Sequence, residues 1–126
     1  METSFKQTTS NKVERYRLFL PQFELLISDE KEEISVLANT AAALREAFGF
    51  FWVGFYLVKD GQLILGPFQG STACYRIRSE IVVPILANGQ VKGVLDIDSN
   101  LLNSFDETDR RYLEEVTAIV AKTLYY

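Results

Sequence analysis

The sequence contains no histidine and a single cysteine, Cys74, among its 126 residues. Without histidine there is no imidazole base, so a Ser-His-Asp triad and a histidine-ligated haem or metal site are excluded. One cysteine can form neither an internal disulfide nor a cysteine-built zinc site. Any chemistry in this chain therefore depends on carboxylates, aromatic side chains and one thiol.

Positive charge and long apolar runs are also scarce. Thirteen Lys and Arg residues stand against seventeen Asp and Glu residues, and the net charge of −4 argues against binding to nucleic acid. No apolar run approaches the roughly 20 residues of a membrane span, and the start at Met1 is typical of a cytoplasmic protein. With 48% hydrophobic and 24% charged residues, the composition predicts one globular domain over residues 1–126.

Apolar residues at helical spacing predict three helices. The first covers residues 11–28, with a kink or break at Pro21. The second runs from about Asp29, its expected N-cap, to Phe48, and the third follows a cap at Asp106. The expected inner faces are Val13, Tyr16, Leu20, Phe23 and Ile27 in the first, Ile34, Leu37, Ala38, Ala41, Leu44 and Phe48 in the second, and Leu113, Val116, Val120 and Leu124 in the third.

The middle of the chain changes to the pattern of strands. Residues 51–58 are aromatic and β-branched and turn through 59–61 into residues 62–65, after which 66–70 has the composition of a loop. Residues 81–86 and 90–98 form a second predicted hairpin. Helices at both ends with hairpins between them predict an α+β fold. We expect the terminal helices to cover one face of an antiparallel sheet and a ligand pocket to lie on the other.

Two registers are open to the second hairpin. A two-residue Asn88-Gly89 turn would pair the apolar positions of residues 81–85 with Asp96, Val94 and Lys92. A three-residue turn over 87–89, with Gly89 at positive φ, pairs them with Leu95, Gly93 and Val91 instead. The second register joins apolar residues to apolar residues, and we predict it.

The predicted register brings three acidic residues together. Asp96 and Asp98 then face away from the helices, and Glu80 lies opposite Asp96. Like charges directly opposed in a sheet are destabilising, so the cluster persists more readily around a cation. A substrate ammonium, a metal ion, or a proton on a carboxyl of raised pKa would serve, and we expect no metal. The alternative is that the three side chains are simply hydrated on an exposed face.

Trp52 and Tyr56 share one face of the first strand with Gly54, opposite Val53 and Phe55. If the aliphatic face meets the helices, the two rings stand on the pocket side. An aromatic wall beside acidic groups suits a small cation or a methyl-bearing ligand. The alternative is that Trp52 is only a large core residue.

Cys74 precedes two cationic residues, Arg76 and Arg78, which could lower the pKa of its thiol and make it reactive. A lone cysteine is more often a small buried apolar residue. On its own it cannot complete an intramolecular redox cycle.

These residues belong to a recognisable series of motifs. In order they are Trp52-Val-Gly-Phe-Tyr56, Gly66-Pro-Phe-Gln-Gly70 followed by Ala73-Cys74, Ser79-Glu-Ile-Val-Val-Pro84, Gly93-Val-Leu-Asp-Ile-Asp-Ser99 and Phe105-Asp106. Together they resemble the free methionine-(R)-sulfoxide reductases, a GAF-domain family, from about residue 12 to residue 124.

The resemblance implies an activity and its site. In the family a cysteine thiolate reduces free methionine sulfoxide, a second cysteine resolves the sulfenic acid as a disulfide, and a thioredoxin-type reductant restores the thiols without a further cofactor. It implies that Glu80, Asp96 and Asp98 bind substrate, that Trp52 and Tyr56 form the wall near the substrate methyl, and that Cys74 is the resolving cysteine. A role in oxidative stress and a homodimer are further expectations.

The chain departs from the family pattern between Ile77 and Arg78. There the resemblance implies a long segment that carries the attacking cysteine, and the sequence has none. Either the segment is deleted from the protein, or it forms a mobile lid that this sequence leaves out. We expect the second, which predicts that the Cα atoms of Ile77 and Arg78 lie further apart than the roughly 3.8 Å of a bonded pair. The alternative function is a GAF module that binds a small ligand or dimerises without catalysis.

Overall fold

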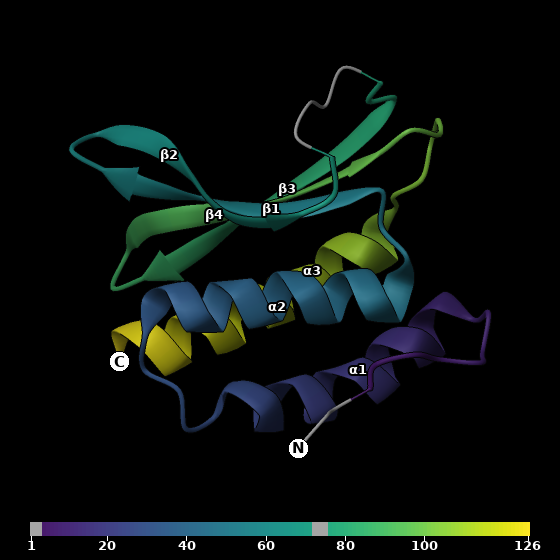
Figure 1. The fold of residues 1–126 in the computed structure, drawn as a ribbon, viewed down its shortest axis with the longest axis horizontal. Helices are drawn as coiled ribbons and strands as arrows, with labels where there is room; N and C mark the ends of the chain where they lie inside the picture. The colour runs from purple at the N-terminus through teal and green to yellow at the C-terminus, as the bar shows by residue number, and fades with distance from the viewer. Residues whose placement is uncertain (1–3, 72–75) are drawn as a thin grey trace.

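The computed structural model describes residues 4–71 and 76–126. Its three helices and four strands follow one another along the chain as Figure 1 shows. They are α1 (Lys12–Ile27), α2 (Glu33–Phe48), β1 (Trp52–Lys59), β2 (Gln62–Gln69), β3 (Ser79–Ala87), β4 (Gln90–Ser99) and α3 (Glu107–Tyr125).

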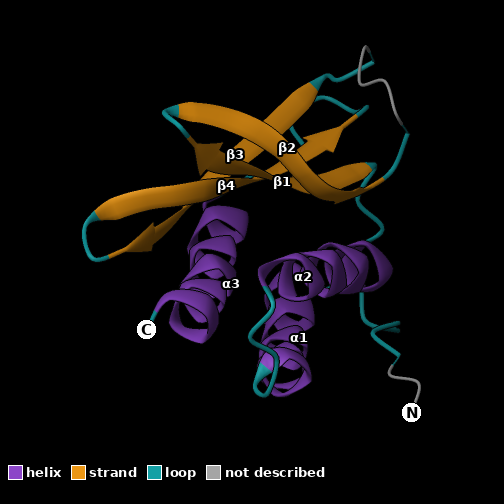
Figure 2. Ribbon diagram, turned by 60° about the vertical axis from the view of Figure 1, so that its left-hand side comes forward, coloured by secondary structure: helices purple, strands orange, loops and turns teal. Residues whose placement is uncertain are grey.

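The strands form one antiparallel sheet in the order β2-β1-β4-β3. Helices α2 and α3 cover one face of this sheet, and α1 packs on their far side (Figures 1 and 2). On the other face of the sheet, called the open face below, the described residues place no helix (Figure 2). The predicted α+β fold with helices on one face is confirmed. Within the described residues, no helix has both the length and the apolar character needed to cross a membrane.

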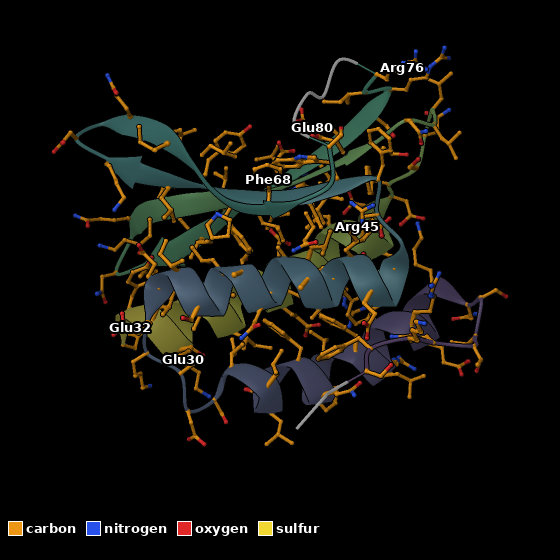
Figure 3. The ribbon with its side chains drawn as sticks, viewed as in Figure 1. Glu30, Glu32, Arg45, Phe68, Arg76 and Glu80 are labelled. Carbon is orange, nitrogen blue, oxygen red and sulfur yellow. The ribbon has the colours of Figure 1, made fainter. Side chains whose placement is uncertain are left out.

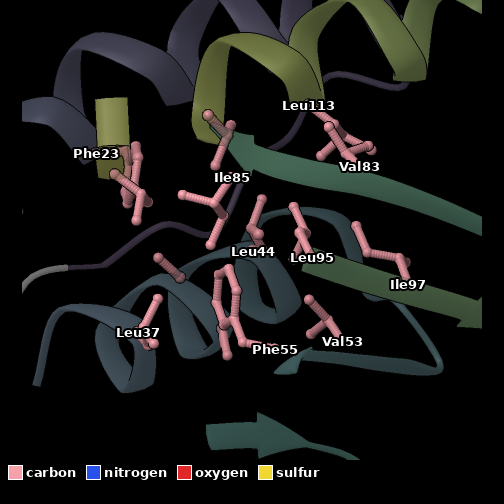
Figure 4. Packing of buried hydrophobic residues seen from close by; sticks show 14 of the residues in the cluster. Phe23, Leu37, Leu44, Val53, Phe55, Val83, Ile85, Leu95, Ile97 and Leu113 are labelled. Carbon is pink, nitrogen blue, oxygen red and sulfur yellow. The ribbon is translucent and has the colours of Figure 1, made fainter. Parts of the chain in front are cut away.

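The core lies between the sheet and the helices. Val53 and Phe55 from β1 and Leu95 and Ile97 from β4 are fully buried there against helical residues such as Leu44 (Figure 4). Burying each such side chain stabilises the fold by about 1.5–3 kcal/mol. Because strand residues alternate between faces, this core fixes which residues of β1 and β4 point to the open face.

Two details of the first helices differ from expectation. Helix α1 continues through Pro21, so the break that was one of the two expectations there is wrong, and the kink stays a prediction. Pro21 and Arg17 are both exposed, so water can hydrate the Arg17 carbonyl that lacks its helical donor. Helix α2 begins at Glu33 rather than Asp29. The predicted core residue Leu37 is buried, but Ile34 is 59% exposed, because the buried side of α2 includes Val36, Thr40 and Ala43 instead.

The predicted cap of the last helix is confirmed. Asp106 caps α3 by accepting from the backbone N–H groups of Thr108 and Asp109. Asp109 accepts in turn from the Tyr16 hydroxyl at 2.6 Å and from Lys12 Nζ at 2.7 Å. These bonds join α1 to the start of α3, and this buried acidic residue is therefore structural.

The β3–β4 hairpin does not have the predicted three-residue turn. Ala87 pairs with Gln90 around a two-residue Asn88-Gly89 turn, whose φ angles of 53° and 75° are those that favour Asn-Gly. A register shift between Ile85 and Leu86 then adds one residue to β4. The extra residue restores apolar pairing, as in Ile81 opposite Ile97, so the predicted faces hold although the turn was wrong.

Strand β2 is longer than predicted, because it includes residues 66–69 of the segment that the composition assigned to a loop. It ends at Gln69 and carries Pro67 within it. An edge strand tolerates proline, since one side of its backbone has no strand to bond. The extension brings Phe68 opposite Gly54 on β1.

Ile77 and Arg78 lead directly into β3 in the described part of the chain. The wider separation expected between their Cα atoms stays a prediction. The Arg78 N–H donates to the Ser99 carbonyl at 2.8 Å, which closes the ladder between β3 and β4 at this end.

Candidate functional site

Three neighbouring strands present one side chain each in a row on the open face. Trp52 of β1 pairs with Asp98 of β4, and Asp98 pairs with Glu80 of β3. Asp96 lies two residues along β4 on the same face, opposite Gly54. The structure thus brings Glu80, Asp96 and Asp98 together as predicted, except that Glu80 pairs with Asp98 rather than Asp96.

The three carboxylates form a compact cluster. Each offers an oxygen within 4.8 Å of the others. Asp96 is 7% exposed and Asp98 2% exposed, whereas Glu80 is exposed and lies on the side of the sheet away from α2 (Figure 3). None of the salt bridges in the described part of the chain involves these three residues. The alternative of acids spread on a hydrated face is therefore wrong for Asp96 and Asp98.

Burial and mutual contact change how the cluster holds protons. Burial, followed by hydrogen bonding to Glu80 and Asp98, raises the pKa of Asp96 to about 9. Burial also raises the pKa of Asp98, to about 6. At neutral pH the coupled pair of Asp96 and Asp98 therefore favours holding a proton, and Asp96, whose pKa burial raises more, is the carboxyl favoured to hold it.

Two oxygens of this cluster, Oδ1 of Asp96 and Oδ1 of Asp98, are buried and have no hydrogen-bond partner among residues 4–71 and 76–126. Buried polar atoms are nearly always paired, so this arrangement favours a proton or a cation among the carboxylates. A ligand ammonium matches the charge. The oxygens could also ligate a hard metal ion, which prefers carboxylates.

Trp52 lies beside the cluster, on the face of β1 that the strand alternation predicts. It is 3% exposed, yet it belongs to the open face and not to the core between sheet and helices. Its ring lies 6.4 Å from that of Tyr56 and stacks on Phe68 at 5.3 Å. Its Nε1–H donates to the Ser71 carbonyl at 3.1 Å.

Phe68 was missed as a site residue by the sequence analysis. The signal was present, because Phe68 follows Leu65 along β2 once the strand is allowed to continue through Gly66 and Pro67. Gly54 was seen only as a strand position, but its missing side chain makes room for both Phe68 and Trp52.

Cys74 lies outside the described residues, so its closeness to the cluster and its activation by arginine stay predictions. Arg76 and Arg78 line a hollow with residues 100–102 at the end of β3 and β4. Arg78 is two residues from Glu80, and it therefore lies at the cluster's end of the sheet.

Comparison with known proteins matches the chain to GAF-domain proteins. The family model of the GAF domain matches residues 75–124. GAF domain-containing protein A of Dictyostelium discoideum is 38% identical, over 95% of this chain and 99% of that protein. The free methionine-R-sulfoxide reductase of Escherichia coli is 33% identical, over 90% of this chain and 91% of the enzyme.

Solved structures agree. The free methionine-R-sulfoxide reductase of Neisseria meningitidis, determined in complex with its substrate, superposes with a TM-score of 0.92 and 39% identity over 98% of this chain and 95% of the other. The alignment with the Dictyostelium protein extends over 156 positions, whereas this chain has 126 residues. At least 30 alignment positions are therefore gaps in this chain.

Proposed function

The chain belongs to the GAF-domain family of free methionine-R-sulfoxide reductases, and from this premise we propose that it binds free methionine sulfoxide on the open face and reduces it with a thiol. The observation that carries the proposal is the buried carboxylate cluster beside an indole wall. A free amino acid brings an ammonium, which the carboxylates accept, and an S-methyl group, which the wall contacts.

The role of each site residue in this proposal follows from its charge and its burial. Asp98, whose pKa burial raises less than that of Asp96, and Glu80 at the rim accept hydrogen bonds from the ammonium. Asp96, with its raised pKa, carries the proton that the sulfoxide oxygen needs. Trp52 and Tyr56 contact the S-methyl group, where an apolar surface is required.

The resemblance gives Cys74 the resolving role, but the chain has no other thiol, and the proposal therefore gives Cys74 the role of the reducing group as well. Its thiolate attacks the sulfoxide sulfur, the oxygen passes to Cys74 with one proton, and methionine and a sulfenic acid result. The substrate sulfur is reduced by two electrons and the cysteine sulfur is oxidised by two.

Regeneration needs an external partner. With one cysteine no internal disulfide can form, so a thiol from outside condenses with the sulfenic acid and releases water. A second external thiol then attacks the mixed disulfide and restores Cys74. A dithiol protein of the thioredoxin type supplies both thiols. Such reductants act in the cytoplasm, and the proposal places the protein there.

The test is reduction of racemic methionine sulfoxide by the whole chain with a thioredoxin system. We expect the R form to be consumed and the S form to remain. N-acetylation, which removes the ammonium charge, should weaken binding by roughly 10- to 150-fold, the value of one charge-assisted hydrogen bond. Binding of the sulfoxide without any turnover would contradict the proposed reductase activity and would favour the alternative, a GAF module that binds a small ligand without catalysis.

A further inference from the structure

Two glycines flank the Trp52 indole. A Cβ added at Gly54 would lie 2.6 Å from Cη2 of Trp52 and 2.5 Å from Cβ of Phe68. A Cβ added at Gly70 would lie 2.7 Å from Cδ1 of Trp52 and 3.0 Å from the Phe51 carbonyl oxygen. Real Cβ atoms essentially never approach within 3.0 Å, so a side chain at either position would displace the ring or its neighbours.

The position of the ring is also held from two other sides. Phe68 stacks on it with an interplanar angle of 20°, and the Ser71 carbonyl accepts its N–H. Gly70, at a φ of 131°, has a backbone conformation that residues with a side chain rarely adopt. The outer edge of the indole therefore lies over Gly54, the residue that pairs with Asp96 of the cluster.

We propose that Gly54 and Gly70 are specificity-determining positions of the site, because they leave the space in which the Trp52 indole lies along β1 beside the carboxylates. The inference rests on the proposed function, in which this ring contacts the S-methyl group. A methyl group added at Gly54 pushes the indole away from the strand, into the room that the ligand needs. Neither glycine touches the ligand, so both act as positioning residues.

The experiment compares Gly54→Ala with a matched control, Gly66→Ala. Gly66 also lies in the sheet, and its added Cβ would meet the Phe55 carbonyl oxygen at 3.2 Å and Leu57 but not Trp52. Trp52 is the chain's one tryptophan, so the protein's fluorescence reports on this ring directly. Two quantities are measured, the emission of the ligand-free protein and the fluorescence titration with methionine sulfoxide.

We expect Gly54→Ala to shift the ligand-free emission and to weaken methionine sulfoxide binding by roughly 10- to 100-fold. Gly66→Ala should change binding by less than about threefold, within the usual range of a tolerated substitution. Wild-type emission and affinity in folded Gly54→Ala would overturn the inference. If the wild type itself does not bind methionine sulfoxide, the proposed function fails, while the ligand-free emission still tests the packing.

If Gly54→Ala does not fold, the double variant Gly54→Ala, Trp52→Phe decides the cause. Phenylalanine removes the contact with Cη2 of Trp52 and leaves the contact with Cβ of Phe68, so recovery of the fold in far-ultraviolet circular dichroism would assign the obstacle to the indole. A double variant that stays unfolded would assign the obstacle to Phe68 and overturn the inference.

Discussion

Replacement of Cys74 by serine is expected to reduce turnover of free methionine sulfoxide to the rate without protein. The reason is that a hydroxyl at neutral pH is neither ionised nor able to accept the sulfoxide oxygen, and the sequence offers no second thiol. Reduction is followed by chromatography of methionine, with dithiothreitol as the external reductant.

Two controls separate chemistry from binding. The Cys74→Ser variant should give the same fluorescence titration with methionine sulfoxide as the wild type, because the cluster and the wall are unchanged. Dimedone, which captures sulfenic acids, should label the wild type after one turnover and should not label the variant. Turnover by Cys74→Ser at the wild-type rate would show that no protein thiol takes part.

Replacement of Asp96 by asparagine is expected to make the folded protein more stable above about pH 6. Burial, then contact with Glu80 and Asp98, raises the pKa of Asp96 to about 9 in the folded state, against a value near 3.9 for an unfolded aspartate. Asparagine has the shape of the protonated acid and retains hydrogen bonds without a titrating proton. We expect a gain in unfolding free energy of at least about 2 kcal/mol at pH 8, since each pKa unit is worth about 1.4 kcal/mol.

The sign of the pH dependence follows from proton binding. The folded state holds the Asp96 proton more tightly than the unfolded state, so the wild type loses stability as pH rises from about 4 toward about 9. Asp98, with its pKa raised to about 6, adds to this loss between about pH 4 and pH 6. Below about pH 4 both states are protonated, and wild type and Asp96→Asn should have the same stability.

Urea unfolding from pH 4 to pH 9 measures this dependence. Asp60→Asn is the matched control, because it removes one carboxylate from the exposed β1–β2 turn, away from the cluster. It should follow the wild type throughout. A wild type whose stability is constant or rises between pH 5 and pH 8 would contradict the account of a proton-sharing cluster.

The faces of the strands could be predicted from the sequence, and with them most of the site. Alternation along β1 predicts that Trp52 and Tyr56 lie opposite Val53 and Phe55, since a strand has a strict period of two. The same rule, with the demand that apolar residues pair, predicts that Asp96 and Asp98 share a face. These expectations depend only on near neighbours in the chain, and the structure confirms them.

Features that depend on contacts between distant residues were predicted poorly. The extra residue in β4 cannot be derived from Asn88-Gly89, because the turn residues are compatible with a bulge or without one. The crowding at Gly54 comes from Phe68 on another strand. The predicted β2 ends before Phe68, so the sequence alone does not bring the two residues together. The predicted apolar face of α2, which includes Ile34, is rotated about the helix axis relative to the face that is buried. Only the packing of α2 against the sheet decides which face is buried.

A crystal structure of the chain with free methionine sulfoxide would show whether the carboxylate cluster and Trp52 together bind this ligand. We expect the ligand ammonium at about 2.8 Å from the carboxylates of Glu80 and Asp98, the usual length of such a bond. We also expect the S-methyl group against Trp52 and the sulfoxide oxygen at Asp96. A ligand bound elsewhere, or a divalent metal ion among the three carboxylates in its place, would contradict the account.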